Sequence, residues 1–195
     1  MRRAREFAVS LPNPWRRARL LLSLLAAVFA LQLLPHPPGV LPVAAMALFA
    51  TASFRSRAAG FAASLGAFTL AGVAIGLATG NWQIAFHPLA PAVYGSWALC
   101  VGLGWWLRDR RSAARIAGAS LAGSLLFFGI TNFAVWLVYD TYSHDAAGLL
   151  ACYVAGLPLL ARGAFADLAY AGGLFGALAL AEHRAPALRE RPAAA

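Results

Sequence analysis

Three of the four histidines lie in short polar or proline-containing stretches between long apolar runs: His36, His87 and His144. Asp140 and Asp145 flank the last of them. Imidazole and carboxylate groups gathered on one face could bind a metal ion or hold a polar ligand. Their spacing is not a metal-ligand motif, however, and turn histidines beside prolines, with an aspartate that caps a helix, account for the same residues. Both interpretations stay open, and no metal is specified.

Asn132 interrupts the apolar stretch that leads to Tyr139, and Trp136 lies four residues further along, on the same face of a helix. A buried amide in lipid must be hydrogen-bonded, either to a neighbouring helix or to a ligand. Asn132 lies seven residues before Tyr139, roughly 10 Å along a helix from the end of this stretch. A ligand can reach that depth if this end faces outward. We therefore expect Asn132 to face an outward-opening cavity, with packing between helices as the alternative.

Asp167 is the one carboxylate predicted to lie at membrane depth. An ionisable residue at that depth is a functional candidate. The alternative is a place at the membrane surface beside Arg162, although five residues is a poor spacing for an ion pair on one helix.

Motifs of intramembrane enzymes are missing from the sequence. It has no His-Glu-x-x-His zinc motif, and no histidine falls within a predicted span to activate a serine. It also contains no lysine, which excludes a Walker-type phosphate-binding lysine and a Schiff base. We therefore expect a protein that is not an enzyme and has no cofactor of its own; any ATP that it uses is hydrolysed by another subunit.

The elements that carry these residues are predicted to be membrane helices. The chain is 61% hydrophobic and 12% charged, and residues 58–92 and 116–139 contain no Asp, Glu, Lys or Arg. Each of these runs is long enough to cross a hydrocarbon core of about 30 Å. We predict an all-α, polytopic membrane bundle with one interfacial or re-entrant helix at 146–160 and six transmembrane helices, at about 20–34, 40–54, 58–79, 92–107, 116–139 and 163–181.

The arginines predict the orientation of this bundle. With six spans, fifteen of the sixteen arginines fall on one side, as the positive-inside rule requires of the cytoplasmic side of a bacterial inner membrane. Both termini are then cytoplasmic, as an Arg-rich tail at 1–19 and a second tail at 182–195 around a transmembrane domain at 20–181. This placement explains the net charge of +9 without a nucleic-acid partner.

Several segments carry a resemblance to a known family. They are Pro35-His36-Pro37-Pro38, residues 42–49, 124–136, 148–153 and 174–176, together with Pro158 and Asp167. Over about 20–181 the chain resembles an uncharacterised family of small bacterial membrane proteins. That family is similar to the substrate-binding (S) components of energy-coupling-factor (ECF) transporters.

The resemblance implies a function. S components are six-helix proteins that bind a vitamin or a metal ion near the outer face and dock on a transmembrane coupling protein with separate ATPase subunits. Ala26 and Ala30 match the Ala-x-x-x-Ala pattern of their docking surface. A vitamin-like or metal-containing small molecule would then be bound by His36, His87, Asn132, Trp136, His144 and Tyr153, with Asp167 in support. The alternative is a non-transporting protein that assembles a larger membrane complex, and an intramembrane enzyme using Asp167 ranks behind both.

Overall fold

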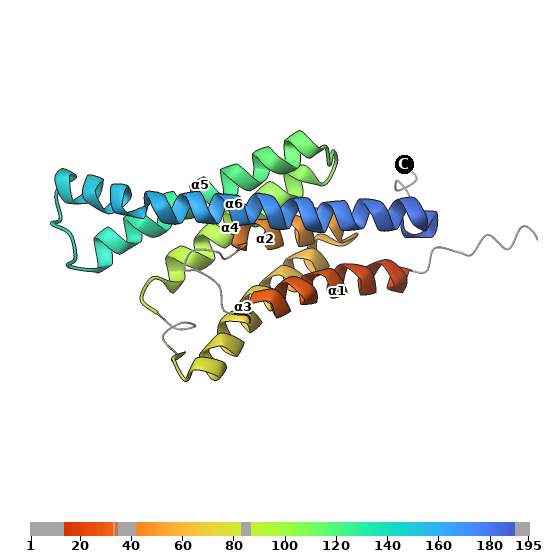
Figure 1. The fold of residues 1–195 in the computed structure, drawn as a ribbon, viewed down its shortest axis with the longest axis horizontal. Helices are drawn as coiled ribbons and strands as arrows, with labels where there is room; N and C mark the ends of the chain where they lie inside the picture. The colour runs from red at the N-terminus through yellow and green to blue at the C-terminus, as the bar shows by residue number, and fades with distance from the viewer. Residues whose placement is uncertain (1–13, 33, 35–41, 83–86, 190–195) are drawn as a thin grey trace, which may run out of the picture.

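The computed structural model describes residues 14–32, 34, 42–82 and 87–189, and these residues form helices and turns without a strand (Figure 1). The prediction of an all-α bundle is confirmed. The helices are α1 (Pro14–Gln32), α2 (Val43–Ser53), α3 (Arg57–Thr79), α4 (Ala90–Leu107), α5 (Ala113–Val138) and α6 (Ala146–Arg184), followed by the short 3-10 helix η2 (Pro186–Leu188).

Three of the described helical segments are long and apolar enough to cross a membrane: Arg57–Leu77 of α3, all of α5 and all of α6. The second expected span, 40–54, corresponds to a helix of only 11 residues, which is about 16 Å long. A helix of that length covers about half of a hydrocarbon core. Within the described residues, each of the six expected apolar segments therefore contains helix, but they are not six equivalent spans.

Helix α6 corrects the prediction for the last third of the chain. Residues 146–160 do not form a separate interfacial or re-entrant helix; they are the first part of one continuous 39-residue helix, with Pro158 inside it. Proline removes one backbone donor from a helix, but α5 packs along α6 on both sides of this point. Tyr153 donates to the carbonyl of Gly129 (2.6 Å), and Ser124 donates to Asp167 (2.7 Å). Contacts with α5 on both sides of Pro158 support the helix where the sequence predicts a break.

Helix α2 lies at the centre of the bundle, and all 11 of its residues are buried. Its sequence is rich in alanine, and the helices around it present glycines to it. A β-carbon added to Gly60 of α3, Gly104 of α4 or Gly123 of α5 would lie closer than 3.0 Å to an atom of α2. Small residues on both sides let the helix axes approach closely. This packing makes α2 the core around which the longer helices are arranged.

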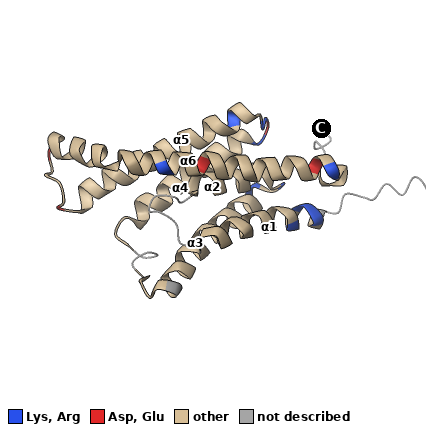
Figure 2. Cartoon of the chain, in the orientation of Figure 1, with Lys and Arg blue, Asp and Glu red and all other residues tan. Residues whose placement is uncertain are grey.

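Most of the basic residues gather at one end of the bundle, where α1 and α5 begin and α4 and α6 end (Figure 2). Several of these arginines contact residues of neighbouring helices or turns. Arg108 donates to the carbonyl of Arg55, and the guanidinium groups of Arg57 and Arg115 lie 6.0 and 4.6 Å from the ring centres of Trp105 and Trp106. We call this the arginine-rich end.

Candidate functional site

The N-terminus of α2 is capped by a side chain from α6. The residue before α2, Pro42, makes no side-chain cap. Instead, Oδ1 of Asp167 accepts from the backbone N–H of Ala45 (2.9 Å), and Oδ2 accepts from the hydroxyl of Ser124 (2.7 Å). Asp167 is 4% exposed. A carboxylate at this position satisfies a free N–H group and complements the positive end of the helix dipole. Asp167 is therefore buried between α2, α5 and α6, where it has a structural role.

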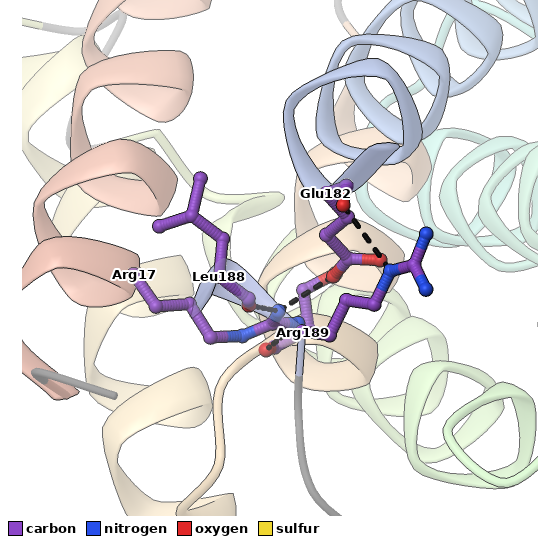
Figure 3. Close-up of polar contacts among 5 residues, drawn as sticks. Arg17, Glu182, Leu188 and Arg189 are labelled. Atoms are coloured by element: carbon purple, nitrogen blue, oxygen red, sulfur yellow. Dashed lines mark hydrogen bonds and ion pairs between the residues drawn. The ribbon is translucent and has the colours of Figure 1, made fainter. Parts of the chain in front are cut away.

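The C-terminus of α2 is held by Arg17, as Figure 3 shows in part. Its Nη2 donates to the carbonyl of Ser53 (3.2 Å), and its Nη1 donates to Glu182 Oε1 and to the carbonyl of Leu188, both at 2.5 Å. Cations are favourable at helix C-termini. Arg17 thereby connects α1, α2 and the end of α6. The expected tail at 1–19 thus contributes the start of α1, which begins at Pro14.

A cavity of about 190 Å³ lies beside the N-terminus of α2, at the end of the bundle opposite the arginine-rich end. Most of its lining comes from Pro42 and the first turn of α2, from residues 68–75 in the second half of α3, and from the start of α4. The remaining positions are Gln32 of α1, Phe127 of α5 and His87. Among the described residues, no Asp, Glu, Lys or Arg lines it. A cavity without charged side chains favours an uncharged, largely apolar occupant.

A small number of polar groups line this cavity: Gln32, Thr69, His87 and Tyr94. The hydroxyl oxygens of Thr69 and Tyr94 lie 3.4 Å apart, and the Tyr94 ring packs edge-on against Phe68 at 5.3 Å. Each hydroxyl can both donate and accept. The cavity can therefore orient a ligand that carries one or two hydrogen-bonding groups on an apolar ring.

The predicted site residues are divided between three places, one of which is the N-terminus of α2, where Asp167 lies. His87 alone of them lines the cavity, and His36 lies outside the described residues. Asn132, Trp136, His144 and Tyr153 belong to the hairpin formed by the end of α5 and the start of α6. Neither these four residues nor Asp167 lines the cavity beside α2. Within the described residues no three His, Cys, Asp or Glu side chains come together as a metal site.

Trp136 and His144 meet at the tip of the hairpin. Their ring centres are 5.6 Å apart, and the indole N–H of Trp136 donates to the carbonyl of Ser143 (2.8 Å). Asp145 caps α6 through its Oδ1, which accepts from the N–H of Gly148 (2.7 Å) and from the hydroxyl of Ser143 (2.9 Å). These two donors lower the pKa of Asp145. The capping role expected as the alternative for Asp145 is confirmed.

Asn132 and Tyr153 lie at the contact between α5 and α6. The amide of Asn132 donates to the carbonyl of Phe128 (2.9 Å), and its Oδ1 lies 2.5 Å from where a β-carbon on Gly156 would be. The hydroxyl of Tyr153 donates to Gly129 on α5. Asn132 thus faces α6, as the helix-packing alternative predicts.

The sequence reasoning did not single out Gln32, Thr69 or Tyr94. Each had a recognisable signal: Gln32 ends an apolar run, and Thr69 lies in the middle of the charge-free stretch 58–92. Tyr94 follows the turn that contains His87. Their proximity depends on how α1, α3 and α4 pack, which no periodicity in the sequence specifies.

The described residues define an all-α protein whose three longest helices could cross a membrane, with a small uncharged cavity at one end. The chain belongs to DUF6580, a family of unknown function whose model matches residues 12–188. No curated protein and no solved structure matches the chain.

Proposed function

We propose that this chain is a multi-pass protein of the bacterial inner membrane that binds a small uncharged solute in the cavity between α2, α3 and α4. The observation that carries this proposal is the cavity itself, about 190 Å³ of space with the hydroxyls of Thr69 and Tyr94 in an otherwise apolar wall. A largely preformed apolar pocket with few polar groups is the usual form of a small-molecule site.

The volume restricts the class of solute. An apolar cavity of about 150 Å³ is large enough to bind benzene, so this cavity of about 190 Å³ fits one substituted ring. A corrin ring, as in cobalamin, is far too large for it. A neutral, single-ring, vitamin-like solute fits both the volume and the absence of charged lining residues.

The orientation follows from the ends of the bundle. Most of the basic residues gather at the arginine-rich end (Figure 2), which by the positive-inside rule lies in the cytoplasm together with both termini. The cavity is built from the opposite ends of the same helices. In this orientation His87 and the cavity lie toward the outer face, where a solute arrives.

This arrangement supports the ECF S-component model of function, in which solute binding is coupled to a transmembrane partner with separate ATPase subunits. Helix α1 buries Leu21, Leu25 and Val28 against the bundle, while Ala26 and Ala30 lie on its exposed face. An exposed small-residue face lets a partner helix approach closely. The same face would serve a non-transporting assembly protein, so the ligand experiment distinguishes the two functions.

Native mass spectrometry of the purified protein tests for a retained small molecule. Neutral single-ring solutes, with nicotinamide and pyridoxine as first probes, are then compared for stabilisation against thermal unfolding. We expect Tyr94→Phe to weaken binding of a stabilising solute about tenfold, because one hydrogen bond is lost. Val73→Phe should abolish binding by filling the cavity.

The matched control is Tyr153→Phe, which removes a hydroxyl from the α5–α6 contact instead of the cavity. It should lower the midpoint of the ligand-free protein and leave the ligand response intact. If no molecule is retained and no solute in the panel stabilises the protein, the assembly function is favoured instead. Equal loss of binding in Tyr94→Phe and Tyr153→Phe would argue against this cavity as the site.

A further inference from the structure

A second cavity, open to one side, runs between α5 and α6 near the arginine-rich end and has a volume of about 570 Å³. We call it the α5–α6 groove. Its walls are mostly small: Ala113, Ala117 and Ser120 on α5, and Ala171, Gly172, Gly176 and Ala179 on α6. Gly172 and Gly176 form a Gly-x-x-x-Gly pair, and both are exposed. A β-carbon on either glycine would meet nothing within 4 Å, so these glycines are not explained by packing within the chain.

Ser120 gives an independent indication that the groove is occupied. Its side chain is 0% exposed and lines the groove, and its hydroxyl has no hydrogen-bond partner among the described residues. A buried hydroxyl without a partner is costly. A backbone carbonyl or polar group entering the groove would satisfy it, whereas a lipid chain would not.

We propose that the α5–α6 groove is the interface with a second copy of this chain, in the same membrane orientation. The two copies are related by a two-fold axis that runs along the groove. Such an axis places the α5 wall of each copy opposite the α6 wall of the other, because a half-turn exchanges the two sides. The interface is therefore self-complementary, as a two-fold interface must be.

The register within one chain shows what the two copies would bring together. Helices α5 and α6 are antiparallel, and Ser124 bonds directly to Asp167. Ser120 lies four residues before Ser124 on α5, and Gly172 lies five residues after Asp167 on α6. Because the two helices are antiparallel, Ser120 and Gly172 lie at about the same depth. A two-fold axis along the groove keeps depth unchanged. Ser120 of each copy then faces Gly172 of the other, where the backbone carbonyls of a glycine-lined helix can approach its hydroxyl.

Charge complementarity favours a second copy over an unrelated helix. Arg111 lies on the α5 side and Glu182 on the α6 side of the same end of the groove. The two-fold arrangement brings Arg111 of each copy toward Glu182 of the other, so that two pairs of opposite charge form at the membrane surface. Each Glu182 already holds Arg17 of its own chain, which fixes the position of its carboxylate.

Cysteine cross-linking in membranes tests the interface. A chain with Ser120→Cys is co-expressed with a differently tagged chain carrying Gly172→Cys, and oxidation should give a mixed disulfide dimer. Cys100 and Cys152 are buried, and a chain without added cysteines controls for them. No cross-link between the two tagged chains would overturn the proposal.

Substitutions in the groove give a second readout, the fraction of dimer by single-molecule photobleaching in bilayers. Gly172→Leu and Gly176→Leu should each weaken the dimer about tenfold or more by filling the groove. Gly173→Leu is the matched control, since Gly173 is equally open but does not line the groove. An equal effect of all three changes, or a wild-type protein that is monomeric with phospholipid retained in the groove, would contradict the proposal.

Discussion

Asp167 is a buried carboxylate in the middle of a long apolar helix, and at the level of the single residue it has a complete set of partners. Its two oxygens accept from the Ala45 N–H of α2 and from the Ser124 hydroxyl of α5. Ionisable residues at such positions are functional candidates by default. Here the carboxylate does what a capping side chain ordinarily does, but it comes from another helix. The structural role explains its burial without a ligand.

Replacing Asp167 should therefore change stability and leave ligand binding intact. Asp167→Ala removes the cap and leaves the buried Ala45 N–H without this acceptor, while the Ser124 hydroxyl can still donate to the carbonyl of Ser120 (3.1 Å). We therefore expect it to lower the free energy of unfolding by about 1–3 kcal/mol. Asp167→Asn keeps an oxygen for the Ala45 N–H and a polar neighbour for Ser124, and should cost less. Thermal unfolding in detergent measures both. A midpoint for Asp167→Ala that equals the wild type would contradict the capping role.

At the level of elements, the arrangement depends on α2, a short helix that cannot satisfy its own ends. Asp167 of α6 accepts a hydrogen bond from a backbone N–H at its N-terminus, and Arg17 of α1 donates one to a carbonyl at its C-terminus. Around it, Gly60, Gly104 and Gly123 allow three helices to approach within backbone contact distance. Close packing, together with hydrogen-bond partners for both of its ends, makes this fully buried 11-residue helix stable.

Two glycines of α4 separate the effect of packing from that of helix propensity. A β-carbon on Gly104 would lie only 3.1 and 3.2 Å from the backbone Cα and O of Leu48, so Gly104→Ala should destabilise the protein by about 1–3 kcal/mol through overpacking. Gly102 is exposed, with nothing within 4 Å of an added β-carbon. Gly102→Ala should be neutral or stabilising by up to about 1 kcal/mol. Thermal unfolding midpoints compare the two, and the reverse order would refute this account of α2 packing.

At the scale of the whole molecule, the bundle has two chemically different ends. One end carries the arginines whose contacts connect the neighbouring ends of α3, α4 and α5. The other is formed by the cavity, and beyond it the α5–α6 hairpin ends in Trp136, Ser143 and His144 (Figure 1). Such a difference in basic residues orients a membrane protein.

Labelling of single introduced cysteines measures this orientation. In spheroplasts, His87→Cys and His144→Cys should react with a membrane-impermeant thiol reagent, because the proposed orientation places both positions toward the outer face. Arg110→Cys should react only after lysis. The native cysteines are buried and provide little background. Labelling of Arg110→Cys in intact spheroplasts, with protection of His144→Cys, would reverse the proposed orientation.

The sequence by itself determined the elements that depend on local patterns. The apolar runs predicted the ends of α2, α3, α4 and α5 to within about three residues, whereas α1 begins earlier than predicted and the last two predicted helices are one. Arginines at the ends of those runs predicted which helix ends lie together. Asp145 was recognised as a possible helix cap because capping is local in the chain.

Only the tertiary structure decided the features that depend on contacts between distant segments. The sequence predicts separate helices at 146–160 and 163–181, but the packing of α5 along α6 supports one continuous helix. The sequence neighbours of Asn132 are apolar and do not show whether its side chain faces a ligand or another helix. Its contact with Gly156 depends on the register between α5 and α6. Gln32, Thr69 and Tyr94 are far apart in sequence and line one cavity because three helices pack around the start of α2. Hydrophobic periodicity specifies which segments are buried, while the shapes of facing side chains determine which of them meet.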